Sequence, residues 1–198
     1  MNLLEQPRIE NYKGSNIEKA GILNVTCDDL PSEYSKEYRE NIIRKANELY
    51  HLGIMKKIEF ADILDSITGQ SNIDEPIEQD ENGNIILDEK LFYKKKDNSI
   101  SLVHNHTNNT FYSDNDITTL VKRNCIKDIF LASNGRLLRL AKSDKISYTI
   151  GESSIFMEIY KIAMDTKNAG YVFADCSDDY FLDIKAIFSK YGLEIERW

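Results

Sequence analysis

Cysteine is scarce in this sequence. Cys27, Cys125 and Cys176 are the only three among 198 residues, and no two of them form a C-x-x-C pair. An odd number of widely spaced cysteines gives no sign of a disulfide framework or of a zinc knuckle. We therefore expect the three thiols to act as small buried hydrophobic groups.

Long apolar runs are also missing. Hydrophobic residues make up 41% of the chain, as in an ordinary globular protein, but no stretch approaches the roughly 18 apolar residues of a membrane helix. The first residues, MNLLEQPRIENYKG, lack the basic start and the apolar stretch of a secretory signal. We expect a soluble, cytoplasmic protein without a membrane partner. The length suits a single domain over residues 1–198.

Positive charge is in the minority. The chain has 25 Lys and Arg residues against 33 Asp and Glu residues, which gives a net charge of −8. Because nucleic-acid binding depends on concentrated positive charge, this balance argues against a nucleic-acid partner. The one basic run, residues 94–96, has acidic neighbours and is interpreted as the solvated edge of a hairpin.

Hydrophobic periodicity predicts helices packed on a sheet, which is an α+β fold. Helical spacing predicts a long helix over 32–52, closed by Gly53, and further helices over 113–124, 151–167 and 177–192. Alternating or short apolar stretches predict strands, which lie within residues 56–66, 84–94, 99–106, 126–133 and 135–144. The last two strands are joined across Asn134-Gly135, a hairpin signal. Residues 72–84 are acidic, contain a proline and end in an Asn-Gly turn signal, so we expect a mobile loop or a hairpin tip there.

Histidine is as rare as cysteine, yet two of the three histidines are two residues apart. On a strand, His104 and His106 project from the same face because side chains alternate with a period of two. For an isolated H-x-H pair, the ordinary explanation is two strand-end residues bonded to nearby loops. The third, His51, lies near the end of the first helix, where the helix dipole explains it.

A carboxylate follows the histidine pair at the start of the next predicted helix. Ser113 is the expected cap of this helix, and Asp114 and Asp116 lie in its first turn. Two histidines and one carboxylate that leave a fourth position for water form a standard catalytic zinc set. The residues alone leave Asp114 as an alternative to Asp116.

These residues resemble the signature of the JAB/MPN metalloproteases, the JAMM motif: a glutamate on an upstream strand, then H-x-H, then S-x-x-D. The match here is H-N-H at residues 104–106 and S-D-N-D at residues 113–116, and its form is most similar to the bacterial, phage and mobile-element branch. Thr107 stands where that family usually has proline, and the loop before Ser113 is one residue shorter than in the best-known eukaryotic members.

The resemblance implies a cytidine-deaminase-like JAB/MPN core over residues 55–142, with a central mixed β-sheet flanked by helices. An N-terminal arm and helix (1–54) would precede this core, and a C-terminal helical extension (143–198) would follow it. The resemblance further implies zinc-dependent hydrolysis of a peptide or isopeptide bond in a protein or peptide substrate. The zinc ligands would be His104, His106 and Asp116.

The two implied catalytic residues are Glu59 and Ser113. The upstream stretch IEFADILDSITGQ resembles the family strand that carries the proton-shuttling glutamate, which makes Glu59 the general base. Ser113 would stabilise the oxyanion. Glu89 remains a competing base because it also lies on a predicted strand upstream of the histidines.

Two other functions remain open beside the zinc peptidase. The first is a catalytically inactive JAB/MPN-fold binding scaffold, since fold does not dictate function. The second is a phage or toxin-system structural protein in which the histidines are incidental. The sequence carries no recognisable substrate motif and does not indicate an oligomeric state.

Overall fold

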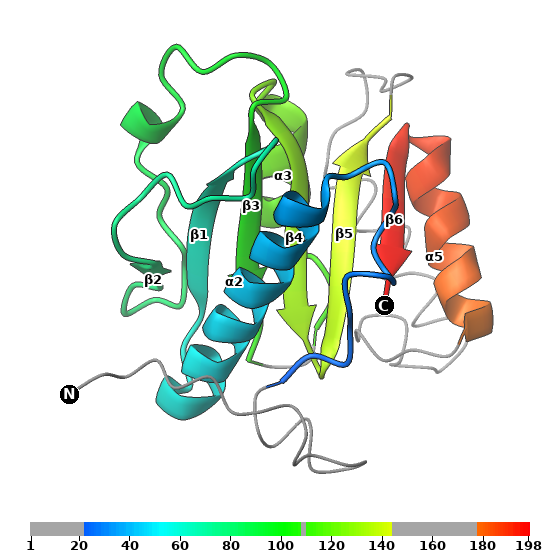
Figure 1. Cartoon of the computed structure of the whole chain (residues 1–198), viewed down its shortest axis with the longest axis horizontal. Helices are drawn as coiled ribbons and strands as arrows, with labels where there is room; N and C mark the ends of the chain where they lie inside the picture. The colour runs from blue at the N-terminus through cyan, green and yellow to red at the C-terminus, as the bar shows by residue number, and fades with distance from the viewer. Residues whose placement is uncertain (1–21, 108–109, 144–177) are drawn as a thin grey trace.

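The computed structural model describes residues 22–107, 110–143 and 178–198 (Figure 1). Over these ranges one six-stranded mixed sheet, in the order β2-β1-β3-β4-β5-β6, is flanked by helices. This confirms the expected α+β class with a central mixed sheet. The helix expected over 151–167 and the thiol of Cys176 lie outside the described residues.

The sheet is antiparallel except at its centre. β3 and β4 are parallel, and every other neighbouring pair is antiparallel. Asn134 and Gly135 join β4 to β5 with φ of 49° and 72°, as a type I′ hairpin turn requires, so this predicted hairpin is confirmed. The strands are β1 (Phe60–Asp65), β2 (Ile77–Glu78), β3 (Ile100–Asn105), β4 (Ile126–Ser133), β5 (Arg136–Lys142) and β6 (Leu193–Arg197).

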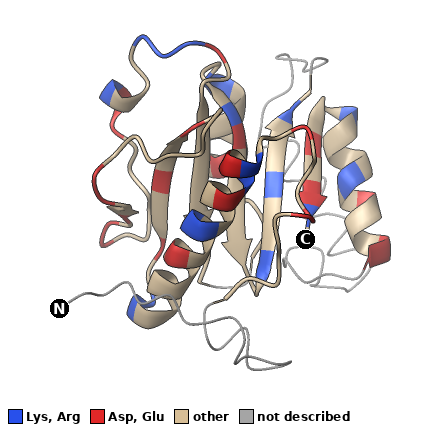
Figure 2. Cartoon of the chain, viewed as in Figure 1, with Lys and Arg blue, Asp and Glu red and all other residues tan. Residues whose placement is uncertain are grey.

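Helices cover both faces of the sheet (Figure 1). On one face lies α2 (Lys36–Lys56), whose Tyr38 and Ile42 pack with Phe60 and Val103 of the sheet. Figure 2 shows that acidic and basic residues alternate along the outer side of this helix, which fits a solvated face.

The opposite face is covered by α3 (Asp114–Lys122) and α5 (Asp178–Lys190). Ile117 of α3 and Ile184 of α5 share a buried cluster with Leu102 of β3. α3 connects the two parallel strands, β3 and β4, so its first turn begins just beyond the carboxyl end of β3. The expected C-terminal extension also contributes a strand, because β6 pairs with β5 at the edge of the sheet.

The first predicted helix differs at both ends. Ser35, not Ser32, caps α2 by accepting the Tyr38 amide at 3.1 Å, and the helix continues past Gly53 to Lys56. A Cβ atom at Gly53 would lie only 2.0 Å from the side-chain nitrogen of Asn105. Gly53 therefore permits a close approach between α2 and β3, and the prediction that it ends the helix was wrong.

Two further predictions between β1 and β3 were wrong. Residues 84–94 form no strand; they contain the short 3-10 helix η3 (Glu89–Leu91), whose first turn is capped by the Asp88 side chain. The basic run over 94–96 accordingly lies in an exposed loop and not on a hairpin edge. The acidic segment 72–84, expected to be a mobile loop or a hairpin tip, supplies the short strand β2, which pairs with β1.

The remaining expectations concern thiols and membranes. Cys125 is buried as expected, while Cys27 is half-buried. Among the described helices, none is both long enough and apolar enough to span a bilayer.

Candidate metal centre

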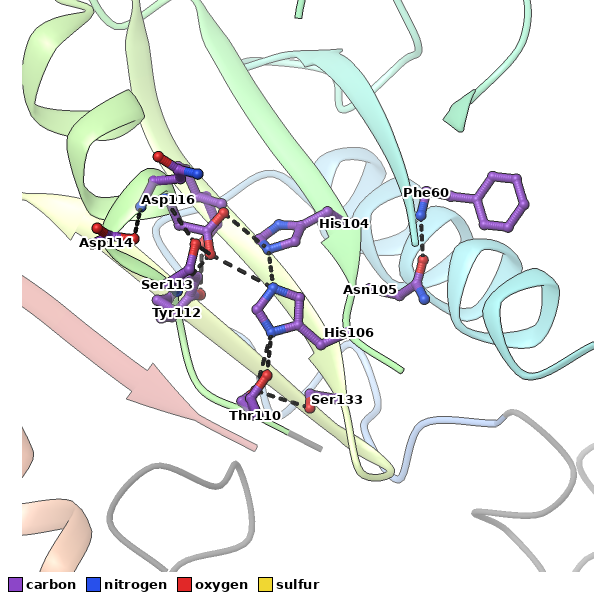
Figure 3. A network of polar contacts seen from close by, with 12 residues as sticks. Phe60, His104, Asn105, His106, Thr110, Tyr112, Ser113, Asp114, Asp116 and Ser133 are labelled. Carbon is purple, nitrogen blue, oxygen red and sulfur yellow. Dashed lines mark hydrogen bonds and ion pairs between the residues drawn. The ribbon is translucent and has the colours of Figure 1, made fainter. Parts of the chain in front are cut away.

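The two histidines and Asp116 meet at the carboxyl end of β3 (Figure 3). His104 lies on β3, His106 follows the strand directly, and Asp116 lies in the first turn of α3. The connection from a strand to the following helix brings the start of that helix to the carboxyl end of the strand, a common place for sites in α/β units. The chain thereby assembles three donor groups from one short segment.

The three donor groups have the spacing of ligands around one small cation. The two Nε2 atoms are 3.2 Å apart, His104 Nε2 is 3.3 Å from Asp116 Oδ1, and His106 Nε2 is 3.6 Å from Asp116 Oδ2. Tetrahedral zinc with bonds of about 2.0 to 2.1 Å places its ligands about 3.3 Å from one another. The two histidines match this spacing but approach different oxygens of Asp116, and one donor atom from each of the three residues lies within 4.8 Å of the others. The group could therefore hold a metal ion.

The outer nitrogen of each imidazole is held by the surrounding chain. His106 Nδ1 lies 2.9 Å from the Thr110 hydroxyl and 3.3 Å from the Thr110 carbonyl, and the His104 ring donates to the backbone carbonyl of Phe130. A carbonyl partner favours a hydrogen on the outer nitrogen, which would leave Nε2 as the electron-pair donor, as in most metal-binding histidines. In that tautomer two lone pairs only 3.2 Å apart would repel each other, and a proton or a cation between them would stabilise the site.

The charges of the cluster reflect the same requirement. Burial lowers the pKa of His104, but the Asp116 carboxylate and Glu59 outweigh burial and shift it upward. Burial and the neighbouring charge of His104 lower the pKa of His106 to about 4. Burial raises the pKa of Asp116, yet both histidines outweigh it, so this pKa falls below its usual value. At neutral pH the site therefore offers a carboxylate and at least one neutral imidazole, which are the forms that bind metal.

Ser113 fixes the orientation of Asp116. The Ser113 amide and hydroxyl both donate to Asp116 Oδ2, at 2.7 Å and 2.8 Å, while the Asp116 amide donates back to the Ser113 hydroxyl. This reciprocal arrangement is a capping box, which stabilises the start of α3. The same hydrogen bonds hold the carboxylate against the two imidazoles.

Glu59 lies beside the cluster. It directly precedes β1, and because Ala61 faces His104 in the antiparallel register, Glu59 continues that register toward His106. Its side chain is half-buried. Burial raises the pKa of Glu59, the charge of His104 lowers it, the charge of Asp116 raises it, and an amide hydrogen bond from Thr107 lowers it; the net shift is upward. The charges of His104 and Asp116 therefore act on the Glu59 carboxyl group.

The competing acids lie elsewhere. Glu89 is exposed on η3 and pairs with Arg123, which follows the far end of α3 from Asp116. Asp114 is exposed, and its carboxylate accepts the Asn115 amide. The structure therefore places Asp116, and not Glu89 or Asp114, with the histidine pair, and places Glu59 directly before β1, the strand that pairs with β3.

Several groups around the site were missed by sequence analysis. The Phe130 carbonyl belongs to the backbone, so no residue type could have revealed it, and Thr110 lies in an ordinary polar loop. Asn105 was treated only as the spacer between the histidines. The alternation of the strand was the available signal, since it places Asn105 on the face opposite His104 and His106.

The low pKa of His106 predicts a specific acid sensitivity of the metal-free protein. Unfolded His106 takes up a proton below pH 6.5, whereas the folded side chain resists protonation until about pH 4. Stability should therefore fall as the pH drops through this interval, by about 3 kcal/mol from this residue. Denaturant unfolding of the chelator-treated protein at several pH values measures the slope.

The comparison for this prediction uses glutamine at the histidine itself. His106→Gln should flatten the slope between pH 6.5 and 4. An identical slope in wild type and His106→Gln would contradict the prediction.

Comparison with protein-family models, with curated proteins and with solved structures found no significant match to this chain.

Proposed function

We propose that this protein is a zinc-dependent peptidase or isopeptidase of the JAMM type. The observation that carries the proposal is the group formed by His104, His106 and Asp116, in which one donor atom from each residue lies within 4.8 Å of the others. Glu59 beside this group adds an acid that is not needed as a ligand. A three-ligand set next to a spare carboxylate suits hydrolysis better than a closed structural zinc site, which uses four protein ligands.

In this proposal the three ligands hold the ion and Glu59 moves the proton. Zinc bound there would lower the pKa of a water molecule toward neutrality and polarise the scissile carbonyl. Glu59 would take the proton as the water oxygen attacks the carbonyl carbon. Glu59 would then deliver this proton to the leaving nitrogen as the C–N bond breaks. The raised pKa of Glu59 suits both steps, because it brings the acid nearer to working pH.

Ser113 has two tasks in this proposal. Its hydroxyl has a single hydrogen, which points to Asp116 Oδ2 at 2.8 Å, so donation to an oxyanion requires the hydroxyl to turn. The Ser113 amide also holds Oδ2, at 2.7 Å, and this bond remains when the hydroxyl turns. The ligand would therefore stay oriented while the hydroxyl stabilises the developing charge.

Ser113→Ala separates these two tasks. The variant should keep its zinc because the backbone amide still holds Asp116. Turnover should fall about 10²- to 10³-fold, as when one oxyanion donor is removed. The lost helix cap should cost about 1 kcal/mol of unfolding free energy. Zinc content, kcat and denaturant unfolding test the three expectations, and unchanged kcat would contradict the oxyanion role.

The proposal as a whole is tested by metal content and hydrolysis. Protein purified without chelator should contain close to one zinc per chain by elemental analysis, which also distinguishes zinc from iron, another metal that two histidines and one carboxylate can hold. Candidate targets are a peptide library, ubiquitin-like fusions and the chain itself. Cleavage should stop with chelator and return with zinc.

Each alternative function predicts a different result in the same assays. A binding scaffold would hold zinc yet cleave no target, and Glu59→Gln would bind any discovered partner as well as wild type does. A structural protein with incidental histidines would contain no stoichiometric metal. Either result would end the proposal of a peptidase.

A further inference from the structure

Asn105, between the two histidines, points to the opposite side of the sheet (Figure 3). Its side chain is only 1% exposed. Its carbonyl oxygen accepts the amide of Phe60 at 2.8 Å, and its amide nitrogen donates to the carbonyl of Ile58 at 3.4 Å. These two backbone groups belong to the residues on either side of Glu59. Asn105 thus binds the chain directly before and directly after the proposed base.

Gln79 holds the backbone of Glu59 itself. The backbone amide of Glu59 donates to the side-chain Oε1 of Gln79 at 2.7 Å, and the carbonyl of Glu59 accepts the backbone amide of Gln79 at 2.9 Å. Gln79 directly follows β2, the edge strand next to β1. Four hydrogen bonds, two from Asn105 and two from Gln79, therefore fix three consecutive residues centred on Glu59.

The fold makes specific room for this arrangement. Asn105 fits beneath α2 only because residue 53 is glycine, since a Cβ atom there would lie 2.0 Å from Asn105 Nδ2 and 2.8 Å from its Cγ. A glycine inside a helix costs about 1 kcal/mol relative to alanine. In α2 this cost arises at Gly53, the position that lies against the Asn105 side chain.

We propose that Asn105 and Gln79 are positioning residues for Glu59. The inference rests on the proposed function, because it needs Glu59 to act at the metal. General bases must lie within hydrogen-bond reach of the proton they take, and small displacements are costly. By alternation, His104 on β3 and His106 directly after it face the proposed metal site, while Asn105 between them binds the chain on either side of Glu59, directly before β1.

The test measures the distance between the Glu59 carboxylate and the metal. Full-length protein is isotopically labelled at its glutamate carboxyl carbons and loaded with Co²⁺ or, as the diamagnetic reference, Zn²⁺. The Glu59 signal is the one that Glu59→Gln removes, and its broadening by cobalt falls steeply with distance. Asn105→Ala and Gln79→Ala should keep cobalt but reduce this broadening about twofold or more, since catalytic groups are normally held within about 0.5 Å.

Ser101→Ala is the matched control. Ser101 lies on the same strand and face as Asn105 and is fully buried. The alanine variant loses the hydrogen bonds of Ser101 to Tyr38 and Asp128, none of which involves the chain near Glu59. Its Glu59 signal should match that of wild type. Gln79 is half-buried at the sheet edge, so Gln79→Ala supplies a test if Asn105→Ala does not fold.

The outcomes separate this inference from the proposed function. If cobalt binds and broadens Glu59 equally in wild type, Asn105→Ala, Gln79→Ala and Ser101→Ala, the positioning role is overturned while the metal site stands. If wild type binds no stoichiometric cobalt or zinc, the proposed function fails, and the positioning role fails with it.

Discussion

Alanine at His104, His106 or Asp116 is expected to abolish near-stoichiometric zinc binding. Each residue supplies one of three donor atoms that lie within 4.8 Å of one another, and no described residue completes the set as a fourth. Loss of a partner that merely orients a ligand weakens metal binding about 10- to 100-fold, so loss of a ligand itself should exceed that range. Elemental analysis and competition with a chromophoric chelator measure the change.

Two variants serve as controls for this prediction. Asp114→Ala removes an exposed acid from the same helical turn as Asp116, and His51→Ala removes the third histidine. Both should retain wild-type zinc. Asp116→Ala should also lower stability, because it removes half of the capping box, so its folding must be checked separately. Full zinc retention by all three ligand variants would refute the metal site.

Glu59→Gln is expected to keep zinc and lose most of the activity. Glutamine has the size of glutamate but cannot carry the proton, and general acid–base catalysis typically contributes about 10² to 10⁴ in rate. Because the raised pKa of Glu59 arises chiefly from burial, the neutral amide should not destabilise the fold. Zinc content, unfolding and kcat on a cleaved target give the comparison.

Glu89→Gln is the matched control for the base. It makes the same chemical change at the acid that the sequence left as the competitor of Glu59, but on exposed η3. Its kcat should equal that of wild type. A large loss of kcat in Glu89→Gln together with normal turnover in Glu59→Gln would show that Glu89, and not Glu59, transfers the proton.

The parts of the fold that sequence analysis predicted well are those with strong local signals. Asn134-Gly135 between two apolar runs specifies a tight hairpin through backbone conformation alone, and that hairpin is present. The strand expected over 84–94 failed for the opposite reason. Its apolar residues are spaced ambiguously, and Leu87 and Leu91 pack against the core from an irregular segment that contains a 3-10 turn.

The candidate site was partly visible because its ligands are close in sequence. Alternation along a strand places His104 and His106 on one face, and a cap signal places Asp116 at the start of a helix. The contacts of Asn105 could not be read in this way. They join Asn105 to Phe60 and Ile58, which are 45 and 47 positions away in the sequence. They also depend on Gly53 in α2, so they arise only from tertiary packing.

The capping box at the start of α3 has a consequence for how a metal site can form. Asp116 is oriented by hydrogen bonds that the helix needs in any case, so folding itself pre-organises one ligand before any cation arrives. The conformational entropy of that side chain is lost once, during folding, and need not be lost again on binding. Helix nucleation and the affinity of this site for a metal ion would thus be thermodynamically coupled through a single carboxylate.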